Sequence, residues 1–248
     1  MTIPFDLGPG AAAYLAVVMF VAAFVRGYSG FGFTAIVVTG STLATDPMNF
    51  VPVVILIDVM LTLVQYRGLR GHIAWGRVTA LAAGALVGVP LGVAVVGWMG
   101  IDLARLAISA FVLAMCGLFL SGWTIPSRQG RPAHAGVGLI SGVANGAAVG
   151  GLPVAAYFAA QGVPAVTFRA TVIIYFTVLD MWTLPFMAQA GMIVRDTFLA
   201  AIYGLPVLLL GLWLGGKHFL RADPQEFRRF AIWLLAALAV MGLLKSAV

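Results

Sequence analysis

Two glycine-rich segments, each set inside a long apolar stretch, carry the residues best suited to bind an anion. The first is residues 26–32 (RGYSGFG) and the second is residues 145–153 (NGAAVGGLP). A helix interrupted within a membrane leaves backbone groups unpaired, which is tolerated only where the break is buried in protein or lines a cavity. The helix that begins after such a break directs N–H groups and positive dipole charge toward it. The two breaks therefore predict a binding site for an anion.

Side chains at the breaks add to this chemistry. The Arg26 guanidinium is suited to a sulfonate, carboxylate or phosphate group, and Ser29, Thr34 and Asn145 can add neutral hydrogen bonds. The alternative interpretation is that the glycines only allow helices to pack closely and that Arg26 reaches to a lipid headgroup. From its position alone, Arg169 is explained at least as well by such a headgroup contact.

Two carboxylates lie in apolar surroundings. Asp58 and Asp180 each sit near the middle of the apolar segment that follows a break, 122 positions apart. Carboxylates within a membrane are costly and usually functional. We expect these two to carry protons or to neutralise a site arginine, with a structural hydrogen bond to the hairpin backbone as the alternative.

The composition indicates which elements must position these residues. Hydrophobic residues make up 62% of the chain and charged residues 9%, and the mean hydropathy is +1.06. Soluble domains carry roughly 25% charged residues, and an apolar run of about 20 residues can span a bilayer core. Several such runs predict an all-α polytopic membrane protein. The first run lacks a cleavage pattern, so we expect no cleavable signal peptide.

The charge and the cysteine content limit which partners and cofactors we expect the chain to bind. The net charge of +6 comes from basic residues in short loops, where they orient a membrane protein rather than bind nucleic acid. The single Cys116 supports neither a disulfide framework nor a cysteine metal site, so no metal and no cofactor are expected. The expected partners are a small anionic substrate and membrane lipid, and self-association into a homo-oligomer is left open.

The chain reads as two matched halves. Besides the two aspartates, Gly71 matches Gly191 and Pro90 matches Pro206 at spacings of 120 and 116 residues, which indicates an internal duplication. The expected first repeat is 1–123, with a hairpin at 11–44 and helices at 50–66, 78–98 and 103–123. A cytoplasmic connector at 124–134 follows, and the second repeat is 135–248, with a hairpin at 135–161 and helices at 165–187, 198–214 and 230–244.

The distribution of Lys and Arg predicts the topology. Residues 11–44 would form roughly 50 Å of helix, too long for one crossing of about 30 Å. If each broken stretch is instead a re-entrant hairpin that returns to its own side, ten basic residues lie on one side of the membrane and three on the other. The excess marks the cytoplasmic side, so both termini are expected outside. The two halves then form an inverted repeat with 8–10 membrane segments, as in many secondary transporters.

One motif suggests an enzyme. Residues 27–30 (GYSG) have the Gly-x-Ser-Gly form found around the nucleophile of intramembrane serine proteases. Such a serine needs a base within hydrogen-bond reach, and His72, His134 and His218 all lie in loops or at segment ends. No ATP-binding Gly-x-x-x-x-Gly-Lys-Ser/Thr motif is present either. We therefore expect a non-enzyme and keep the protease as a remote alternative.

At these motifs the sequence resembles the TauE/SafE family of sulfite and organosulfonate exporters, in the sulfonate permease group. The resemblance is carried by residues 26–33 (RGYSGFGF), 142–146 (GVANG), 150–153 (GGLP), Tyr157 and 168–171 (FRAT). Leu152 stands where similar sequences often have the first of two prolines. The resemblance also makes Arg169 a site candidate, because Phe-Arg-Ala-Thr recurs in similar sequences.

The resemblance implies a secondary transporter that exports sulfite or an organosulfonate across the inner membrane, with the substrate held near the midplane between the two tips. Alternatives are a proton-coupled uptake permease, an anion channel and a non-transporting assembly factor. The candidate substrate-binding residues are Arg26, Gly27, Tyr28, Ser29, Gly30, Phe31, Gly32, Asn145, Gly146, Gly150, Gly151, Pro153, Tyr157 and Arg169, and the candidate coupling or structural carboxylates are Asp58 and Asp180.

Overall fold

The computed structural model describes residues 4–126, 129–219, 233, 236–237 and 240, and every regular element in this part of the chain is a helix. The expected all-α class is therefore confirmed. The elements are η1 Pro4–Asp6, α1 Pro9–Ser29, α2 Phe33–Ser41, α3 Pro47–Leu69, η2 Arg70–His72, α4 Trp75–Gly97, α5 Ile101–Leu120, α6 Arg131–Asn145, α7 Gly151–Ala160, α8 Ala165–Gln189 and α9 Arg195–Phe219.

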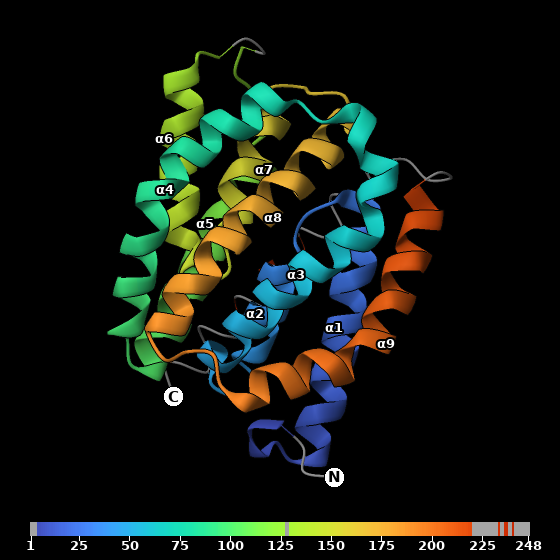
Figure 1. Cartoon of the computed structure of the whole chain (residues 1–248), viewed down its shortest axis with the longest axis vertical. Coiled ribbons are helices and arrows are strands. Elements are labelled where there is room, and N and C mark those ends of the chain that lie inside the picture. The colour runs from blue at the N-terminus through green and yellow to red at the C-terminus, as the bar shows by residue number, and fades with distance from the viewer. Residues whose placement is uncertain (1–3, 127–128, 220–232, 234–235, 238–239, 241–248) are drawn as a thin grey trace.

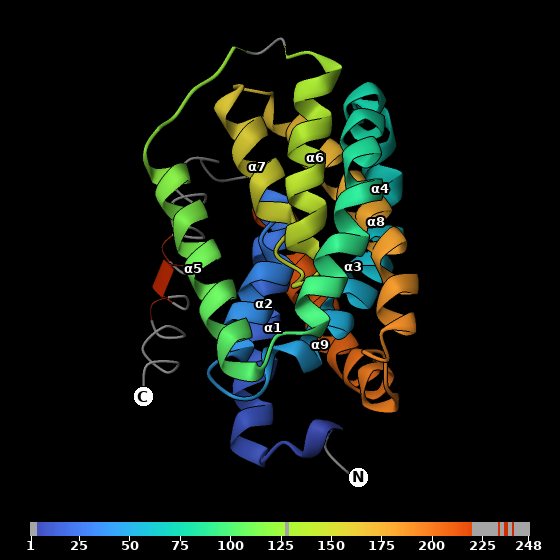
Figure 2. The ribbon, with the colours of Figure 1, turned by 90° about the vertical axis from the view of Figure 1, so that its left-hand side faces the viewer.

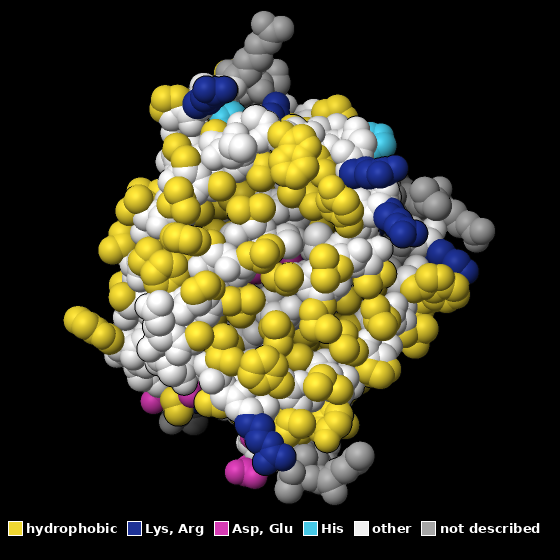
Figure 3. Space-filling model, in the orientation of Figure 1, with side chains coloured by type: hydrophobic (Ala, Val, Ile, Leu, Met, Phe, Trp, Pro, Cys, Tyr) yellow, Lys and Arg dark blue, Asp and Glu magenta, His cyan; other side chains and the backbone are white. Residues whose placement is uncertain are grey.

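Six of the described helices are long and apolar enough to cross a membrane: α1, α3, α4, α5, α8 and α9. A helix satisfies its own backbone groups, and about 20 residues reach across a hydrocarbon core of roughly 30 Å. Apolar side chains cover the middle of the face shown in Figure 3, while Lys and Arg lie toward its ends. The protein is a multi-pass membrane protein.

Two broken hairpins enter the bundle from opposite ends. The helix α1 runs up from the end that holds the N-terminus and turns back into the shorter α2, whereas α6 enters from the other end and turns back into α7 (Figure 1). Figure 2 shows α6 and α7 in the upper half of the molecule and α1 and α2 below them. Because α2 also contacts α7, the two hairpins meet inside the protein.

Glycines let α4 and α6 approach with their backbones in contact. The facing rows have glycines at every fourth residue, so small residues follow one face of each helix. A Cβ atom at Gly142 of α6 would lie 2.9 Å from the Val89 nitrogen of α4. The rows are Gly84, Gly88 and Gly92 on α4 and Gly138, Gly142 and Gly146 at α6.

A similar contact joins α1 to α9. A Cβ atom at Gly211 of α9 would lie 2.6 Å from the Phe20 carbonyl oxygen of α1, and one at Gly27 of α1 would collide with the Leu212 carbonyl oxygen. These two contacts cross between the halves of the chain, because α6 packs on α4 and α1 packs on α9. Each hairpin is thereby braced by a long helix from the other half.

The helices α3 and α8 form the centre of the bundle. They pack against each other, cross in front of the hairpins in Figure 1, and are the most deeply buried of the six long helices. The start of α3 is fixed by Asp46, whose carboxylate accepts a hydrogen bond of 2.9 Å from the Met48 N–H, and by Pro47 at the first helical position. This places Asp58 and Asp180 inside the protein, away from lipid.

The first break is shorter than the glycine-rich sequence suggests. Residues 26–29 continue α1, and only residues 30–32 leave the helix. Gly27 lies within the continuous helix α1, where the missing side chain allows close packing against α9 and does not form a turn. The predicted last helix, 230–244, lies largely outside the described residues.

Candidate functional site

The first hairpin tip is a turn of three residues held by two glycines. Gly30 and Gly32 have φ values of +83° and +89°, which L side chains rarely adopt, and the Gly30 N–H donates to the Arg26 carbonyl oxygen at 2.8 Å. The first hydrogen bond of α2 runs from the Ile36 N–H to the Gly32 carbonyl oxygen at 2.9 Å. The preceding N–H groups of α2 therefore point into the tip, as an anion site at a helix N-terminus requires.

Ser29 ties this turn together. Its hydroxyl group contacts the Val25 carbonyl oxygen at 2.9 Å and the Phe31 carbonyl oxygen at 3.0 Å. Both partners are backbone acceptors, and neither is a base that would activate a nucleophile. The geometry gives Ser29 a structural role in the closed tip.

The second hairpin tip is longer and is anchored to α8. It runs from Gly146 to Gly150, and Ala148 takes a φ of +55° within it. The Ser141 hydroxyl donates to the Gly150 carbonyl oxygen at 2.6 Å, and the Tyr175 hydroxyl donates to the Ser141 oxygen at 3.0 Å. The sequence did not single out Ser141 or Tyr175, whose hydroxyl groups fix the start of α7.

Arg26 is fully buried and paired with Asp58. Its side chain is 1% exposed, and its Nη1 donates to Asp58 Oδ1. Its Nη2 donates to the Thr62 hydroxyl oxygen at 2.7 Å and to the Asp58 carbonyl oxygen at 3.2 Å. Arg26 thus makes a buried ion pair inside the bundle and does not reach to a headgroup.

Asn145 makes the matching contacts in the second half. Its Nδ2 donates to Asp180 Oδ1 at 3.0 Å and to the Thr183 hydroxyl oxygen at 2.9 Å. Each hairpin therefore presents one side chain, at the end of its first leg, to an aspartate and a threonine of the following long helix. The first half uses a guanidinium in this place and the second half a neutral amide.

The two halves of this cluster touch each other. The side chains of Asp58 and Asp180 lie within hydrogen-bonding reach across the contact between α3 and α8. We call Arg26, Asp58, Thr62, Asn145, Asp180 and Thr183 the central polar cluster. Thr62 and Thr183 were not predicted, although their spacing of four and three residues from the aspartates puts them on the same helix face.

Arg169 reaches the first tip from the other half of the chain. It lies near the start of α8, and its Nη2 donates to the Gly27 carbonyl oxygen at 2.7 Å. A Cβ atom at Gly30 would lie 2.7 Å from Arg169 Cγ, so the glycine makes room for this side chain. Arg169 and Arg26 are near enough to act on each other electrostatically. Two guanidinium groups therefore converge on the end of α1.

The predicted aromatic residues lie in two groups. Phe31 at the first tip stacks on Phe119 with ring centroids 5.7 Å apart and meets the edge of Phe168 at 5.9 Å. Tyr157 instead lies against the ring of His134 at 5.4 Å, in the second hairpin. Tyr28 is buried near the end of α1. Phe31 thus belongs to the first tip, whereas Tyr157 belongs to the second hairpin.

The remaining predicted residues belong to the second hairpin and mainly allow close packing. A Cβ atom at Gly146 would collide with the Gly92 backbone, and one at Gly151 would lie 2.8 Å from the Phe176 ring. Gly150 is confined in the same way by Ser141 and Asn145, and Pro153 is buried in the first turn of α7.

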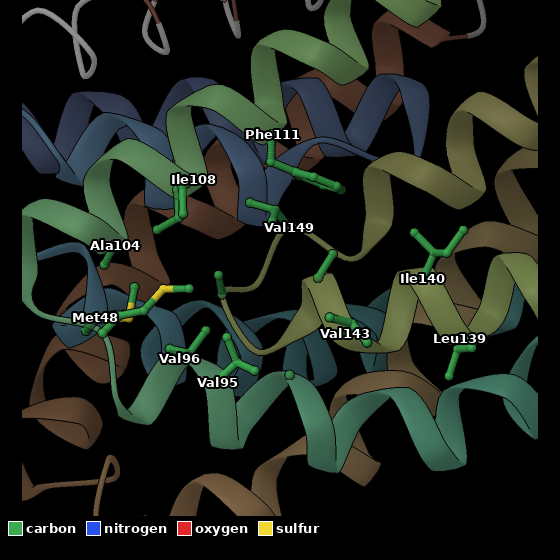
Figure 4. A pocket seen from close by; sticks show the side chains of 15 residues that line it. Met48, Val95, Val96, Ala104, Ile108, Phe111, Leu139, Ile140, Val143 and Val149 are labelled. Carbon is green, nitrogen blue, oxygen red and sulfur yellow. The ribbon is translucent and has the colours of Figure 1, made fainter.

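A large apolar cavity lies beside the second tip. It has a volume of about 410 Å³ and is lined by side chains from α4, α5, α6 and the second tip, among them Phe111, Val143 and Val149. Figure 4 shows these apolar side chains around the cavity, with Met48 at its edge. No charged residue lines it, so the cavity does not supply the charge that an anion site needs.

The comparisons identify the family. The family model described as sulfite exporter TauE/SafE matches residues 15–242, which is nearly the whole chain. No curated protein and no solved structure matches it. The matched region includes both hairpin tips, the central polar cluster and Arg169. The chain belongs to the sulfite exporter TauE/SafE family of membrane transporters.

Proposed function

We propose that this protein is a secondary transporter that exports sulfite or an organosulfonate across the inner (plasma) membrane. The observation that carries the proposal is the convergence of Arg26 and Arg169 on the first hairpin tip. In this proposal the two guanidinium groups and the N–H groups at the start of α2 bind the sulfur oxyanion. Fixed donors suit a trigonal or tetrahedral oxyanion because several oxygens can be bound at once.

The proposed substrate competes with Asp58 for Arg26. Arg26 and Asp58 are each 1% exposed, so an anion reaches the guanidinium only when the bundle opens and the ion pair separates. Exchanging one oxyanion for another at the same guanidinium avoids leaving a buried charge unpaired, which is the costly outcome. The ion pair would thus keep the empty site neutral between transport events.

We further propose that the two halves act as an inverted repeat. The support is the matched placement of Arg26–Asp58–Thr62 and Asn145–Asp180–Thr183, together with the exchanged contacts of α1 with α9 and of α6 with α4. Rocking of one half against the other would then open the tips alternately to each side of the membrane. The excess of basic residues at the end that holds the connector supports a cytoplasmic location for that end and external termini.

Membrane energetics favour the export direction. An inside-negative potential of about 100 mV corresponds to roughly 2.3 kcal/mol for each charge moved. That energy favours expulsion of a monovalent anion by about 50-fold. Export therefore needs no coupling ion, whereas uptake against this potential requires one.

Rapid jumps of anion concentration on proteoliposomes test the proposal. The panel is sulfite, isethionate, sulfoacetate, acetate and chloride, with current as the readout. We expect a saturable current limited to sulfur oxyanions and strongly reduced in Arg169→Ala, while Arg105→Ala at the periphery keeps it. A current that does not saturate would favour an anion channel. Silence across the panel from folded protein would remove the proposed substrate class.

A further inference from the structure

The contact between Asp58 and Asp180 brings two buried carboxyl groups together in the centre of the bundle. Both side chains are almost fully buried, with exposed fractions of 1% and 2%. Asp58 Oδ1 accepts a hydrogen bond from Arg26, and Asp180 Oδ1 accepts one from Asn145. Neither Oδ2 atom has a donor among the described residues. Two ionised carboxylates cannot hydrogen-bond to each other, because both are acceptors only.

The ion pair that the described residues form at the two aspartates is that of Asp58 with Arg26. The charged or titratable side chains at the pair are Asp58 and Asp180 themselves, Arg26 from α1, and Tyr175 on α8. Arg169, at the start of α8, lies next to Arg26 and donates to the Gly27 carbonyl oxygen. The Tyr175 hydroxyl is engaged with Ser141, and α6 contributes the neutral amide of Asn145. The helices α2 and α7 carry no Asp, Glu, Lys or Arg, and those of α4, α5 and α9 lie in their terminal turns. Ionisation of both aspartates would therefore make Asp180 a buried anion whose contacts among the described residues are neutral groups and the carboxylate of Asp58.

We propose that Asp58 and Asp180 form a single proton-binding site that is shared by the two halves of the protein. One proton supplies the missing donor between the two carboxyl groups, and with Arg26 it balances the charge of the two aspartates. The proton belongs nearer to Asp180, because Asp58 is held ionised by the guanidinium. Like-charged carboxylates in contact bind one proton strongly for the same reason in other proteins.

The proton has a mechanical consequence. It joins α3 of the first half to α8 of the second half, between Arg26 at the end of α1 and Asn145 at the end of α6. Loss of the proton places two carboxylates against each other in a medium of low dielectric constant, which pushes α3 and α8 apart. The site therefore closes the bundle when protonated and favours its opening when deprotonated, whichever anion is moved.

Infrared spectroscopy of the purified protein in lipid tests the proposal without any substrate. We expect the wild-type protein to show a carboxylic-acid C=O stretching band at neutral pH, which shifts in D₂O. In Asp180→Asn the band is lost, because an amide replaces the protonated carboxyl group. In Asp58→Asn it is lost as well, because Asp180 then becomes the ionised partner of Arg26. Asp102→Asn is the matched control, since that side chain is 84% exposed and its loss leaves the band unchanged.

Three outcomes would overturn the proposal. A wild-type spectrum without the acid band shows that no proton is held. A band that persists in Asp58→Asn shows that Asp180 is protonated independently and that the proton is not shared. A band that appears only when sodium is replaced by a large organic cation shows a sodium site instead. The first and third outcomes are read on the wild-type protein, so they do not depend on whether a variant folds.

Discussion

At the scale of residues, the two halves of the protein use the same positions for different chemistry. Arg26 and Asn145 occupy matching places at the ends of α1 and α6, and each contacts an aspartate and a threonine of the next long helix. Only the first half supplies a charge there, and Arg169 adds a second guanidinium to the same tip. The asymmetry places the proposed oxyanion binding at the first tip, with the second tip as its mainly neutral counterpart.

The double role of Arg26 can be separated by two variants. Arg26→Gln leaves the Asp58 carboxylate buried without its cation and should cost about 3–5 kcal/mol of stability. The double variant Arg26→Gln, Asp58→Asn removes charge and countercharge together and should recover most of that loss. Thermal unfolding in detergent checks this part of the prediction.

Transport by the same double variant should remain low, because the guanidinium is absent from the proposed site. Flux of sulfite into proteoliposomes is the measurement. Wild-type flux from the double variant would show that Arg26 only balances Asp58 and does not bind substrate.

The residues of the central polar cluster were only partly predictable. Arg26, Asn145, Asp58 and Asp180 stand out because polar side chains are rare in apolar segments. Their pairing depends on how the hairpins dock on α3 and α8, which no local pattern specifies. Thr62 and Thr183 escaped notice because a threonine in a membrane helix usually satisfies its own hydroxyl on the preceding turn, as both also do here.

At the scale of elements, glycines have two separate tasks that the sequence does not distinguish. Gly30 and Gly32 make the turn of the first tip with positive φ angles, whereas Gly27 and Gly146 bring helices into backbone contact. A run of glycines in an apolar stretch predicts both a break and close packing, so the break looked longer in the sequence than it is.

The packing task is tested on α6 with a matched pair of variants. Gly142→Ala places a methyl group 2.9 Å from the Val89 nitrogen and 3.0 Å from Gly88, so α4 and α6 must move apart. We expect a loss of roughly 1–3 kcal/mol, read as a lower melting temperature. Gly136→Ala on the same helix meets nothing within 4 Å and should be neutral or slightly stabilising. Equal melting temperatures for the two variants would contradict the close contact.

The turn task is tested at Gly30. Gly30→Ala forces an L residue to a φ of +83° and adds a methyl group 2.7 Å from Arg169 Cγ. The backbone strain alone should cost about 1–2 kcal/mol, and displacement of Arg169 should raise the KM for sulfite. Gly68→Ala, in a helix with open space around it, is the control. An unchanged KM for sulfite in Gly30→Ala would show that Arg169 does not take part in substrate binding.

At the scale of the whole molecule, the hairpin of each half packs against a long helix of the other half. The first hairpin packs on α9 and the second on α4, and α3 meets α8 in the middle. The all-helical class and the membrane setting were predictable, because composition and apolar run length determine them. The exchanged packing was not, because it depends on which glycine faces fit together in three dimensions.

The orientation of the molecule is tested by cysteine labelling. In a Cys116→Ala background, Asp102→Cys and Arg70→Cys place exposed thiols at the start of α5 and just after α3. With both termini outside, a membrane-impermeant maleimide added to intact cells should label position 102 and leave position 70 unlabelled until the membrane is opened. The reverse pattern would invert the proposed topology.

We propose a carrier that binds a sulfur oxyanion between its hairpin tips. Counterflow tests it most directly, because only a carrier exchanges substrate across the membrane. Proteoliposomes loaded with unlabelled sulfite are diluted into trace labelled sulfite, and the label inside is followed over time. We expect a transient accumulation of label that is saturable and lost in the Arg26→Gln, Asp58→Asn double variant. Label that only equilibrates, or accumulation that the double variant retains in full, would contradict it.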